Sequence, residues 1–399
     1  MDGSKIRSLS GGANQSGLRD YNERLLLSML QRNGAMPGSD LARRAGLSPQ
    51  TVSVILRKLE KDGLLERGTP VRGKVGKPSV PMGLAPDGVF SLGANIDRRS
   101  AKVVLMDFTG NVRAEVTTSY AYPMPAAIFE FLETAYGDLT GQLDDAQFSR
   151  LCGIGIGAPF ELWNWHELVG APAKDFALWN DVDFQERVAE FSNLPVFVIN
   201  DATAACRAEH VYGRGKEFRD YAYFFLAAFV GGGIVLNHSV YEGHQGNAGA
   251  LGSLRSVGPN GESRQLIDIA SIHLLEARLM EVGLDPSGLW KSDDWSEYAR
   301  YVEPWIRQTA QELAKAALST CSVIDFEAIL IDGALPADVK ETLVARTQRY
   351  VSTQDTRGLI PPLVEAGEMG GQAREIGAAC KPIFSQYLLN TNSVLSDRG

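Results

Sequence analysis

The clearest fold signal in this chain is the stretch VINDATAA, residues 198–205. Val198 and Ile199 have the character of the end of a buried strand, and Asn200 and Asp201 precede small residues that suit the start of a helix. In α/β folds, a carboxylate at the carboxyl end of a strand is a common position for a catalytic base. The stretch therefore predicts an α/β fold. It also raises the question whether Asp201 removes a proton from a substrate or only holds a ligand.

Strands alternate with helices on both sides of this stretch. The glycine-spaced segment 148–160 predicts a strand and turn before it, and the segment 221–237 predicts two strands around the glycines 231–233 after it. The other expected elements are a strand hairpin turned by the residues Thr-Gly-Asn, a strand with a turn, and a closing helix, at residues 90–108, 326–335 and 370–384. This order indicates an α/β domain of two lobes.

The composition is typical of a soluble globular protein. The chain has 399 residues, enough for two or three domains, with 44% hydrophobic and 22% charged residues. No segment approaches the ~18 uninterrupted apolar residues of a membrane span, and residues 1–17 lack the apolar core of a signal peptide. We therefore expect a cytoplasmic protein with no membrane partner. The four cysteines form no C-x-x-C pair, so we expect reduced, mostly buried thiols.

Charge is distributed unevenly along the chain. Residues 1–80 carry 14 Lys and Arg against 7 Asp and Glu, although the whole chain has a formal net charge of −9. A basic N-terminal part on an acidic body indicates that only the first part binds a polyanion. The alternative is chance drift of surface charge, which charge alone does not exclude.

Three helices are predicted between residues 19 and 63. The first ends at Gly34, and a turn at Gly46 follows the second. The expected inward-facing residues are Leu25, Leu26, Met29 and Leu30 in the first helix and, in the second helix, which Ser39 caps, Leu41 and Ala45. The third helix begins with Ser48 as N-cap and Pro49 at its first position. Its expected buried stripe is Val52, Ile55, Leu56 and Leu59.

A short helix, a glycine turn and a third helix with small polar residues at its exposed start are typical of a helix-turn-helix. The basic segment 64–82 after it predicts a hairpin wing, with Arg67 near the tip. We therefore expect a winged helix-turn-helix that binds a double-stranded DNA operator. The predicted DNA contacts are Ser48, Gln50, Thr51, Ser53 and Arg57 in the third helix, and Arg72, Lys74 and Lys77 in the wing. The alternative is a small three-helix bundle used for protein contact.

The motifs beyond residue 88 follow one another in a distinctive order. They are a strand hairpin, G-x-G-x-P at 155–159, N-D-A at 200–202, a glycine triplet at 231–233, A-G-x-x-G at 248–252 and IGAA at 376–379. In this order and spacing the chain resembles the ROK family of sugar kinases and repressors, and the helix-turn-helix resembles the repressor branch. The resemblance implies the two-lobed actin-like ATPase (hexokinase-type) fold. It also implies that the aspartate of N-D-A, here Asp201, is the catalytic base in kinase members.

The expected fold class is therefore α/β, with an N-terminal winged helix-turn-helix followed by a two-lobed ROK domain. The expected boundaries place the winged helix-turn-helix at residues 1–85 and the second lobe at 206–370. The first lobe is expected at residues 86–205, with a C-terminal helix at 371–388 packing back on it.

The phosphate elements of such kinases are altered in this chain. Where the kinase pattern resembles D-I-G-x-[ST] this chain has Asn95 and Asp97, and where it resembles G-T-G-x-G-G-G it has Ala228 and Phe229. The third glycine-rich turn contains Asp332. Asn95 lacks the charge that helps to hold magnesium, Phe229 fills space that a triphosphate needs, and added carboxylates repel phosphate.

The sugar and zinc elements are altered as well. Where kinase members resemble A-G-E-x-G-H, this chain has Ala250 and Ser253, and a further family glutamate falls on Ile267. The segment that resembles the family's zinc region contains no cysteine. We therefore expect no metal, no cofactor and no catalysis, with Asp201 a vestigial base.

Aromatic and polar residues of the body predict a pocket for a small ligand. Aromatic faces stack on the C–H faces of sugars and a few polar groups fix the hydroxyls, which favours a sugar or sugar derivative. The expected ligand residues are Pro159, Trp165, Asn200, Asp201, His244 and Asn247. Two alternatives stay open: Asn200 and Asp201 as a helix cap with no ligand, and the tryptophans as ordinary core.

The leading functional hypothesis is a DNA-binding transcriptional regulator, a repressor, whose kinase-like body senses a sugar without phosphorylating it. We expect it to act as a homodimer or homotetramer, because helix-turn-helix proteins usually present two heads to two half-sites. One alternative is an active ATP-dependent sugar kinase that also binds DNA. Another is a regulator with no small-molecule effector that a protein partner switches.

Overall fold

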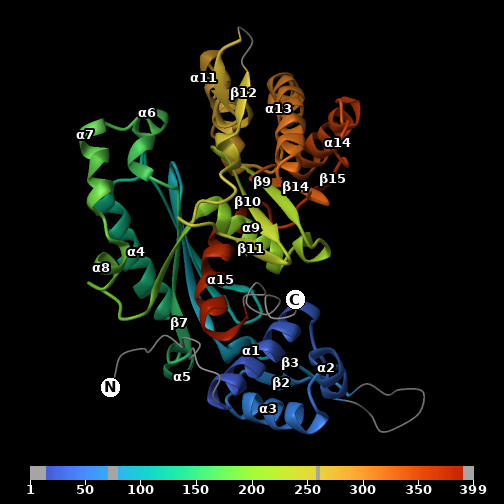
Figure 1. Ribbon diagram of the computed structural model, residues 1–399. Coiled ribbons are helices and arrows are strands. Elements are labelled where there is room, and N and C mark those ends of the chain that lie inside the picture. Colours follow the sequence, from blue (N-terminus) through green and yellow to red (C-terminus); the bar gives the residue numbers. More distant parts are fainter. Residues whose placement is uncertain (1–14, 71–79, 258–260, 390–399) are drawn as a thin grey trace. The chain divides into compact units, whose positions relative to one another are not determined.

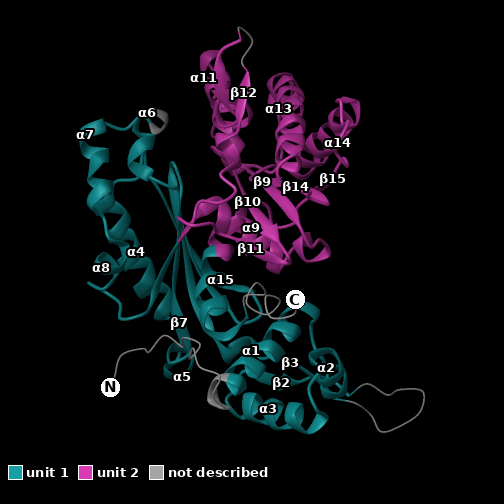
Figure 2. Ribbon diagram, viewed as in Figure 1, with its two compact units in different colours: residues 1–198, 378–399 teal, residues 199–377 magenta. Residues whose placement is uncertain are grey.

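The computed structural model describes residues 15–70, 80–257 and 261–389. Contacts divide the chain into two compact units, Met1–Val198 with Ala378–Gly399, and Ile199–Gly377 (Figure 2). The division therefore falls inside one strand and inside the last helix. Our expected division into three domains, with lobe boundaries after residues 205 and 370, stays a prediction.

Unit 1 begins with the winged helix-turn-helix (Figure 1). Its elements are α1 (Gln15–Asn33), β1 (Met36–Pro37), α2 (Gly38–Ala45), α3 (Pro49–Lys61), β2 (Leu65–Arg67) and β3 (Pro81–Leu84). The strands form an antiparallel sheet in the order β1-β3-β2. Helix α3 has the expected buried stripe, with Val52, Ile55, Leu56 and Leu59 all under 9% exposed.

Two details of the first helices differ from the expectation. In α1, Leu26, Leu27 and Leu30 are buried, whereas Leu25 and Met29 are only half-buried. The face is rotated because the end of α15 (Ala373–Tyr387) covers α1 on a second side, at Arg24 and Ser28.

In α2, Ser39 lies inside the first turn and does not cap the helix. The N-cap is Pro37, whose extended backbone continues directly from β1, and no side chain caps the helix. Leu41 is buried, as expected, whereas Ala45 is only half-buried and Ala42, one turn earlier, is buried. Gly46 forms the turn at φ 66°, as expected.

The rest of unit 1 is a five-stranded sheet with helices, joined to the wing by the short η1 (Pro86–Gly88). Its strands, in the order β6-β5-β4-β7-β8, are β4 (Phe90–Ile96), β5 (Ser100–Asp107), β6 (Val112–Ser119), β7 (Leu151–Ala158) and β8 (Val196–Asn200). Its helices are α4 (Pro125–Thr140), α5 (Asp145–Phe148), η2 (Leu162–Trp165), α6 (His166–Val169), α7 (Ala173–Phe176), η3 (Ala177–Asp181) and α8 (Phe184–Val188). Strand β4 pairs antiparallel with β5 and parallel with β7.

The later part of α15 packs directly on the backbone of this sheet. The Ser91 hydroxyl on β4 donates to the carbonyl of Ala379 at 2.8 Å. A Cβ on Gly155 of β7 would lie 1.9 Å from the carbonyl oxygen of Ala378. Pro382 lies four residues after Ala378 inside the helix and has no N–H to donate to that carbonyl. The Ala378 carbonyl therefore accepts no helical hydrogen bond from residue 382 and can lie directly against Gly155.

Unit 2 holds a second five-stranded sheet, in the order β11-β10-β9-β14-β15, and a two-stranded ribbon of β12 and β13. The strands are β9 (Tyr221–Leu226), β10 (Val230–Leu236), β11 (Ser239–Tyr241), β12 (Arg255–Val257), β13 (Ser263–Gln265), β14 (Ala328–Gly333) and β15 (Leu363–Ala366). The longer helices are α9 (Asp201–Val211), α11 (Ile272–Glu281), α13 (Ala299–Cys321) and α14 (Ala337–Thr353). The short ones are α10 (Ile267–Ala270), α12 (Gly288–Lys291), η4 (Arg214–Glu217), η5 (Leu251–Ser253), η6 (Ser296–Tyr298) and η7 (Gly370–Gln372).

We had expected the glycine triplet to lie between two strands. It lies instead inside β10. The turn from β9 to β10 is made by residues 227–229. A Cβ on Gly231 would lie 2.7 Å from that of Ala202, and a Cβ on Gly233 would lie 2.4 Å from that of Cys206. The glycines are therefore required because helix α9 packs directly on strand β10.

We predict that Gly155→Ala destabilises the protein by about 1–3 kcal/mol, because its methyl group collides with the Ala378 carbonyl. The matched control is Gly137→Ala in α4, where a Cβ meets nothing within 4 Å. That change should stabilise by about 0.5–1 kcal/mol, because alanine has the higher helix propensity. Both are measured as urea-unfolding midpoints. Equal midpoints for the two variants would contradict the close approach.

Candidate nucleic-acid interface and ligand residues

The start of α3 is organised by its own side chains. The Ser48 hydroxyl oxygen accepts a hydrogen bond from the Thr51 amide at 3.1 Å, which makes Ser48 the N-cap. The hydroxyls of Ser48 and Thr51 also bond to each other at 2.8 Å. Gln50 is exposed beside them. In the first turn, Gln50 is therefore an exposed polar side chain that is not used by the cap.

One turn later, Arg57 folds back along the helix. Its guanidinium donates to the Ser53 carbonyl at 3.1 Å and to the Ser53 hydroxyl at 3.2 Å. Ser53 is exposed, but its hydroxyl already has a partner. These contacts use Nε and one Nη, so they orient the guanidinium along the helix without using all of its donors.

Val54 is a surface residue that we did not single out from the sequence. Its side chain is 49% exposed on α3, beside Ser53 and one turn from Gln50. The signal was present, because Val54 is an apolar residue out of phase with the buried stripe. An exposed apolar group on a DNA-reading helix suits the methyl group of thymine.

The wing is a hairpin of β2 and β3, with Arg67 opposite Met82. Arg67 lies at the end of β2 and forms a two-point ion pair with Glu60 of α3, at 2.6 and 3.1 Å. This hydrogen bonding lowers the pKa of Glu60. Arg67 therefore ties the wing to α3. The other predicted wing contacts, Arg72, Lys74 and Lys77, lie outside the described residues.

At the end of β8, Asn200 and Asp201 have different roles. The Asn200 side-chain oxygen accepts from the Thr203 amide at 3.0 Å and caps α9. Asp201 is the first residue of α9, and its side chain is 20% exposed. One Asp201 oxygen lies 3.8 Å from the Arg374 guanidinium, which also sits over the Phe225 ring at 5.4 Å. The capping alternative thus describes Asn200, and Asp201 pairs with an arginine.

The other expected ligand residues belong to different units. Pro159 and Trp165 follow β7 in unit 1, where the Trp165 indole donates to the Phe160 carbonyl at 3.0 Å. His244, which is exposed, and Asn247, which is half-buried, follow β11 in unit 2. Trp179 is 3% exposed and stacks on Phe184, so it is a core residue.

Asn95 and Phe229, at positions that resemble the phosphate elements of kinases, have different surroundings. Asn95 is 4% exposed, and within the described part of the chain its side-chain oxygen has no hydrogen-bond partner. Phe229 packs edge-on against His273 with ring centroids 5.0 Å apart.

Asp332 is wholly buried, which corrects our expectation that its carboxylate repels phosphate. It pairs with Lys340 at 2.9 Å and accepts from the Gly370 amide at 2.8 Å. The charge is therefore neutralised internally, and the carboxylate holds the segment around Gly370.

A second buried carboxylate, Glu209 of α9, holds the same segment. Glu209 accepts from the amides of Glu368 and Met369 at 2.9 and 3.1 Å, and from the Arg214 amide at 2.8 Å. Burial raises the pKa of Glu209, and the nearby Asp332 raises it further, whereas the amides lower it. Two carboxylates thus fasten residues 367–370 beside the carboxyl end of β14. Sequence patterns did not reveal Glu209, because its partners are 159 and 160 residues away.

The two parts of the chain match two known domain types. A profile described as winged helix-turn-helix DNA-binding matches residues 19–66, and the ROK family profile matches residues 92–380. The fold and these matches define a DNA-binding transcriptional regulator with a sugar-kinase-like body. The chain belongs to the ROK family.

Curated relatives match this chain at low identity. The uncharacterized protein y4fQ of Sinorhizobium fredii is 26% identical over 371 residues, which cover 92% of this chain and 91% of that protein. The Xylose repressor of Bacillus subtilis is 24% identical over 242 residues, 61% of this chain and 62% of the repressor. The dual regulator NagC of Escherichia coli is 23% identical over 263 residues, 63% of this chain and 62% of NagC. The matched regions of the last two span less than two thirds of either regulator.

Solved structures show the same fold. A ROK family transcriptional regulator described as a homolog of the E. coli MLC protein superposes with a TM-score of 0.65 at 20% identity, over 92% of this chain and 96% of that chain. A ROK family glucokinase from Streptomyces griseus, solved with glucose and AMPPNP, has a TM-score of 0.55 at 20% identity. It covers 73% of this chain and 98% of the glucokinase. Separately, across residues 15–70, 80–257 and 261–389, no helix is both long and apolar enough to cross a membrane.

We predict that Gln50→Ala and Lys74→Ala weaken DNA binding in different ways. Gln50→Ala should relax sequence choice, because a good base contact contributes ~1–3 kcal/mol of discrimination. Lys74→Ala should weaken binding to all sequences and reduce the log–log salt slope by about one unit.

Affinities are measured at several salt concentrations on operator and scrambled duplexes. Equal losses on both duplexes, with the same change in slope for both variants, would contradict base reading by α3.

Proposed function

We propose that this protein is a transcriptional repressor that binds operator DNA through α3 and the wing. We further propose that its ROK body senses a sugar or sugar derivative without phosphorylating it. The observation that carries the proposal is the exposed start of α3. It combines a hydrogen-bonded N-cap at Ser48 with an exposed polar side chain at Gln50 and an exposed apolar side chain at Val54. Such a surface suits the major groove, whose base pairs present both polar edges and thymine methyl groups.

Loss of kinase activity is part of the proposal. Phosphoryl transfer needs backbone N–H groups and a metal around the phosphates. Where kinase members resemble a carboxylate and a glycine, this chain has Asn95 and Phe229, and residues 368–370 are held by Asp332 and Glu209. These features favour a body that does not hold a nucleotide triphosphate.

Ligand sensing is supported by Asp201 and Arg374. Their pair is long, at 3.8 Å, and the Asp201 side chain remains partly exposed. A hydroxyl group of a bound sugar could donate to this carboxylate. The resemblance to sugar kinases and the name of one relative, the Xylose repressor, support the class of ligand. A protein partner acting in place of a sugar remains the competing hypothesis.

We predict no ATP-dependent sugar phosphorylation, because the phosphate elements are altered. A coupled ADP-release assay over a panel of sugars measures this. Turnover by the wild-type protein that disappears in Asp201→Asn would overturn the prediction and favour the active kinase.

We predict that a sugar or sugar phosphate from such a panel raises the melting temperature of the protein. A ligand at 100 times its dissociation constant stabilises the native state by about 2.7 kcal/mol. The shift should disappear in Asp201→Asn and persist in Glu341→Gln, an exposed carboxylate on α14. A wild-type protein with no shift across the panel would favour the protein-partner hypothesis.

We predict a homo-oligomer, at least a dimer, held mainly by residues beyond 88, because two heads are needed for two half-sites. Light scattering at micromolar concentration measures the mass. A monomer, with and without DNA, would count against the prediction.

A further inference from the structure

We propose that two arginines, Arg150 and Arg24, hold the DNA-binding domain rigidly on the first lobe. Each arginine caps the carboxyl end of a helix that belongs to the other domain. Arg150, from the lobe, caps the recognition helix α3. Arg24, from the DNA-binding domain, caps the lobe-packing end of α15. The inference rests on the proposed function. Both arginines are positioning residues, because they act on DNA binding through the placement of α3.

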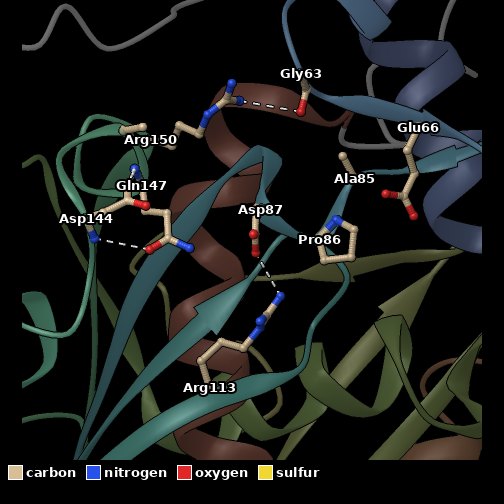
Figure 3. A pocket seen from close by; sticks show the side chains of 10 residues that line it. Gly63, Glu66, Ala85, Pro86, Asp87, Arg113, Asp144, Gln147 and Arg150 are labelled. Atoms are coloured by element: carbon tan, nitrogen blue, oxygen red, sulfur yellow. Dashed lines mark hydrogen bonds and ion pairs between the residues drawn. The ribbon is translucent and has the colours of Figure 1, made fainter.

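The first half of the clamp is at the carboxyl end of α3. Helix α3 ends at Lys61 with Asp62 as its C-cap. The Arg150 side chain donates from Nη1 to the carbonyls of Asp62 at 3.3 Å, Gly63 at 3.5 Å and Gly88 at 3.1 Å. Figure 3 shows the guanidinium pointing at the Gly63 carbonyl.

Gly63 permits this approach. Its φ is 74°, which disfavours other residues, and a Cβ there would lie 2.5 Å from Arg150 Nη2. The backbone of Arg150 is itself fixed, since its carbonyl accepts from the Phe90 amide of β4 at 3.0 Å. The guanidinium is thus held by the sheet and presented to α3.

The second half of the clamp is at the carboxyl end of α15. Arg24 on α1 is 8% exposed and donates to the carbonyl of Ser385 at 3.2 Å. The Ser28 hydroxyl, one turn further along α1, accepts from the Leu389 amide at 2.8 Å. The end of α15, which ends at Tyr387, is therefore held by two side chains of α1.

The same physics acts in both halves. The last four carbonyls of a helix lack partners within the helix, and the carboxyl end carries partial negative charge. A guanidinium satisfies both needs because it is a cation with several N–H donors. Each domain therefore supplies what a helix end of the other lacks.

The connection between the domains is also bound on both sides. The Ala85 amide donates to the Leu64 carbonyl of the DNA-binding domain at 3.0 Å, and the Phe108 amide of the lobe donates to the Pro86 carbonyl at 3.1 Å. A surface hollow of about 530 Å³, lined by Arg150 and Asp87 among others, lies beside this connection (Figure 3).

A rigid clamp makes the body determine how far apart two DNA-binding domains stand in an oligomer. Half-sites recur with the helical repeat of DNA, about 10–10.5 base pairs, so each inserted pair rotates one site away from its domain. A clamped protein is strict about spacing, and an unclamped one is tolerant. A purely structural arginine would change stability and leave spacing tolerance unchanged.

The experiment uses the full-length chain and DNA probes selected from a random library by the wild-type protein. One probe carries a single half-site, one carries two half-sites at the selected spacing, and others insert one, two or three base pairs. Affinities are compared for wild type, Arg150→Ala, Arg150→Lys and the control Lys174→Ala, an exposed residue of α7. We expect a two-pair insertion to weaken wild-type and Lys174→Ala binding about tenfold, because the second contact is lost.

Arg150→Ala should lose less than about threefold in affinity on the same insertion and keep its affinity for a single half-site. Without the clamp the DNA-binding domain is joined to the lobe only by the connecting segment, so it can still reach the displaced half-site. Arg150→Lys, which retains a cation, should restore part of the spacing preference. An unchanged spacing penalty in Arg150→Ala would overturn the clamp, and so would an equal loss on the single half-site, since that indicates damage to α3. Failure of the wild type to select any DNA would instead overturn the proposed function, and the spin-label measurement below would then decide on the clamp.

A second measurement does not involve DNA. Spin labels on Lys61→Cys in α3 and Glu130→Cys in α4 report the distance between the two domains, and the four native cysteines are buried. We expect a narrow distance distribution that broadens when Arg150→Ala is added. A wild-type distribution as broad as that of the variant would contradict the clamp.

Discussion

Helix α15 packs so closely on α9 and on β7 that two of the contact positions have room only for glycine. The packing of each unit depends on one of these contacts. A Cβ on Gly377 would lie 1.7 Å from the Ala204 carbonyl oxygen, and one on Gly155 would lie 1.9 Å from that of Ala378. Within unit 2, Gly377 therefore packs backbone to backbone on α9, and within unit 1, Ala378 does the same on β7. The carbonyl of Ser385, near the carboxyl end of α15, accepts a hydrogen bond from Arg24 of the DNA-binding domain. The placement of α15 by Gly155 therefore also determines where the DNA-binding domain contacts the first lobe.

Much of the fold could be predicted because its signals are local. The stripe of α3 and its Ser48 cap depend on residues within four positions of one another, and both were predicted correctly. The errors arose where distant contacts dominate. The buried face of α1 is rotated by α15, which is more than 340 residues away, and the glycines of β10 serve the packing of α9. No periodicity in the sequence carries that information.

The candidate sites divide in the same way. The exposure of Gln50 follows from its position outside the buried stripe of α3. Val54 also lies outside the stripe, but an apolar residue is usually expected in the core, so its exposure was not predicted. The sequence marked Asp332 as a departure from the kinase pattern, but only the structure shows its partner Lys340. Because the two charges pair, Asp332 is not a charge that repels phosphate but part of an internal ion pair. Residue identity thus indicated which positions differ from a kinase, and tertiary contacts indicated what the new residues do.

The order of the segments along the chain has a consequence for biosynthesis. The sheet of the first lobe is complete once β8 has emerged from the ribosome, yet part of one face is covered by Ala378 and the residues after it. At translation rates of about 5–20 residues per second, the roughly 180 intervening residues of unit 2 take about 10–40 s to synthesise. During that interval Ser91 and Gly155 lack their partner. The first lobe can therefore reach its final packing only after the last helix has been synthesised.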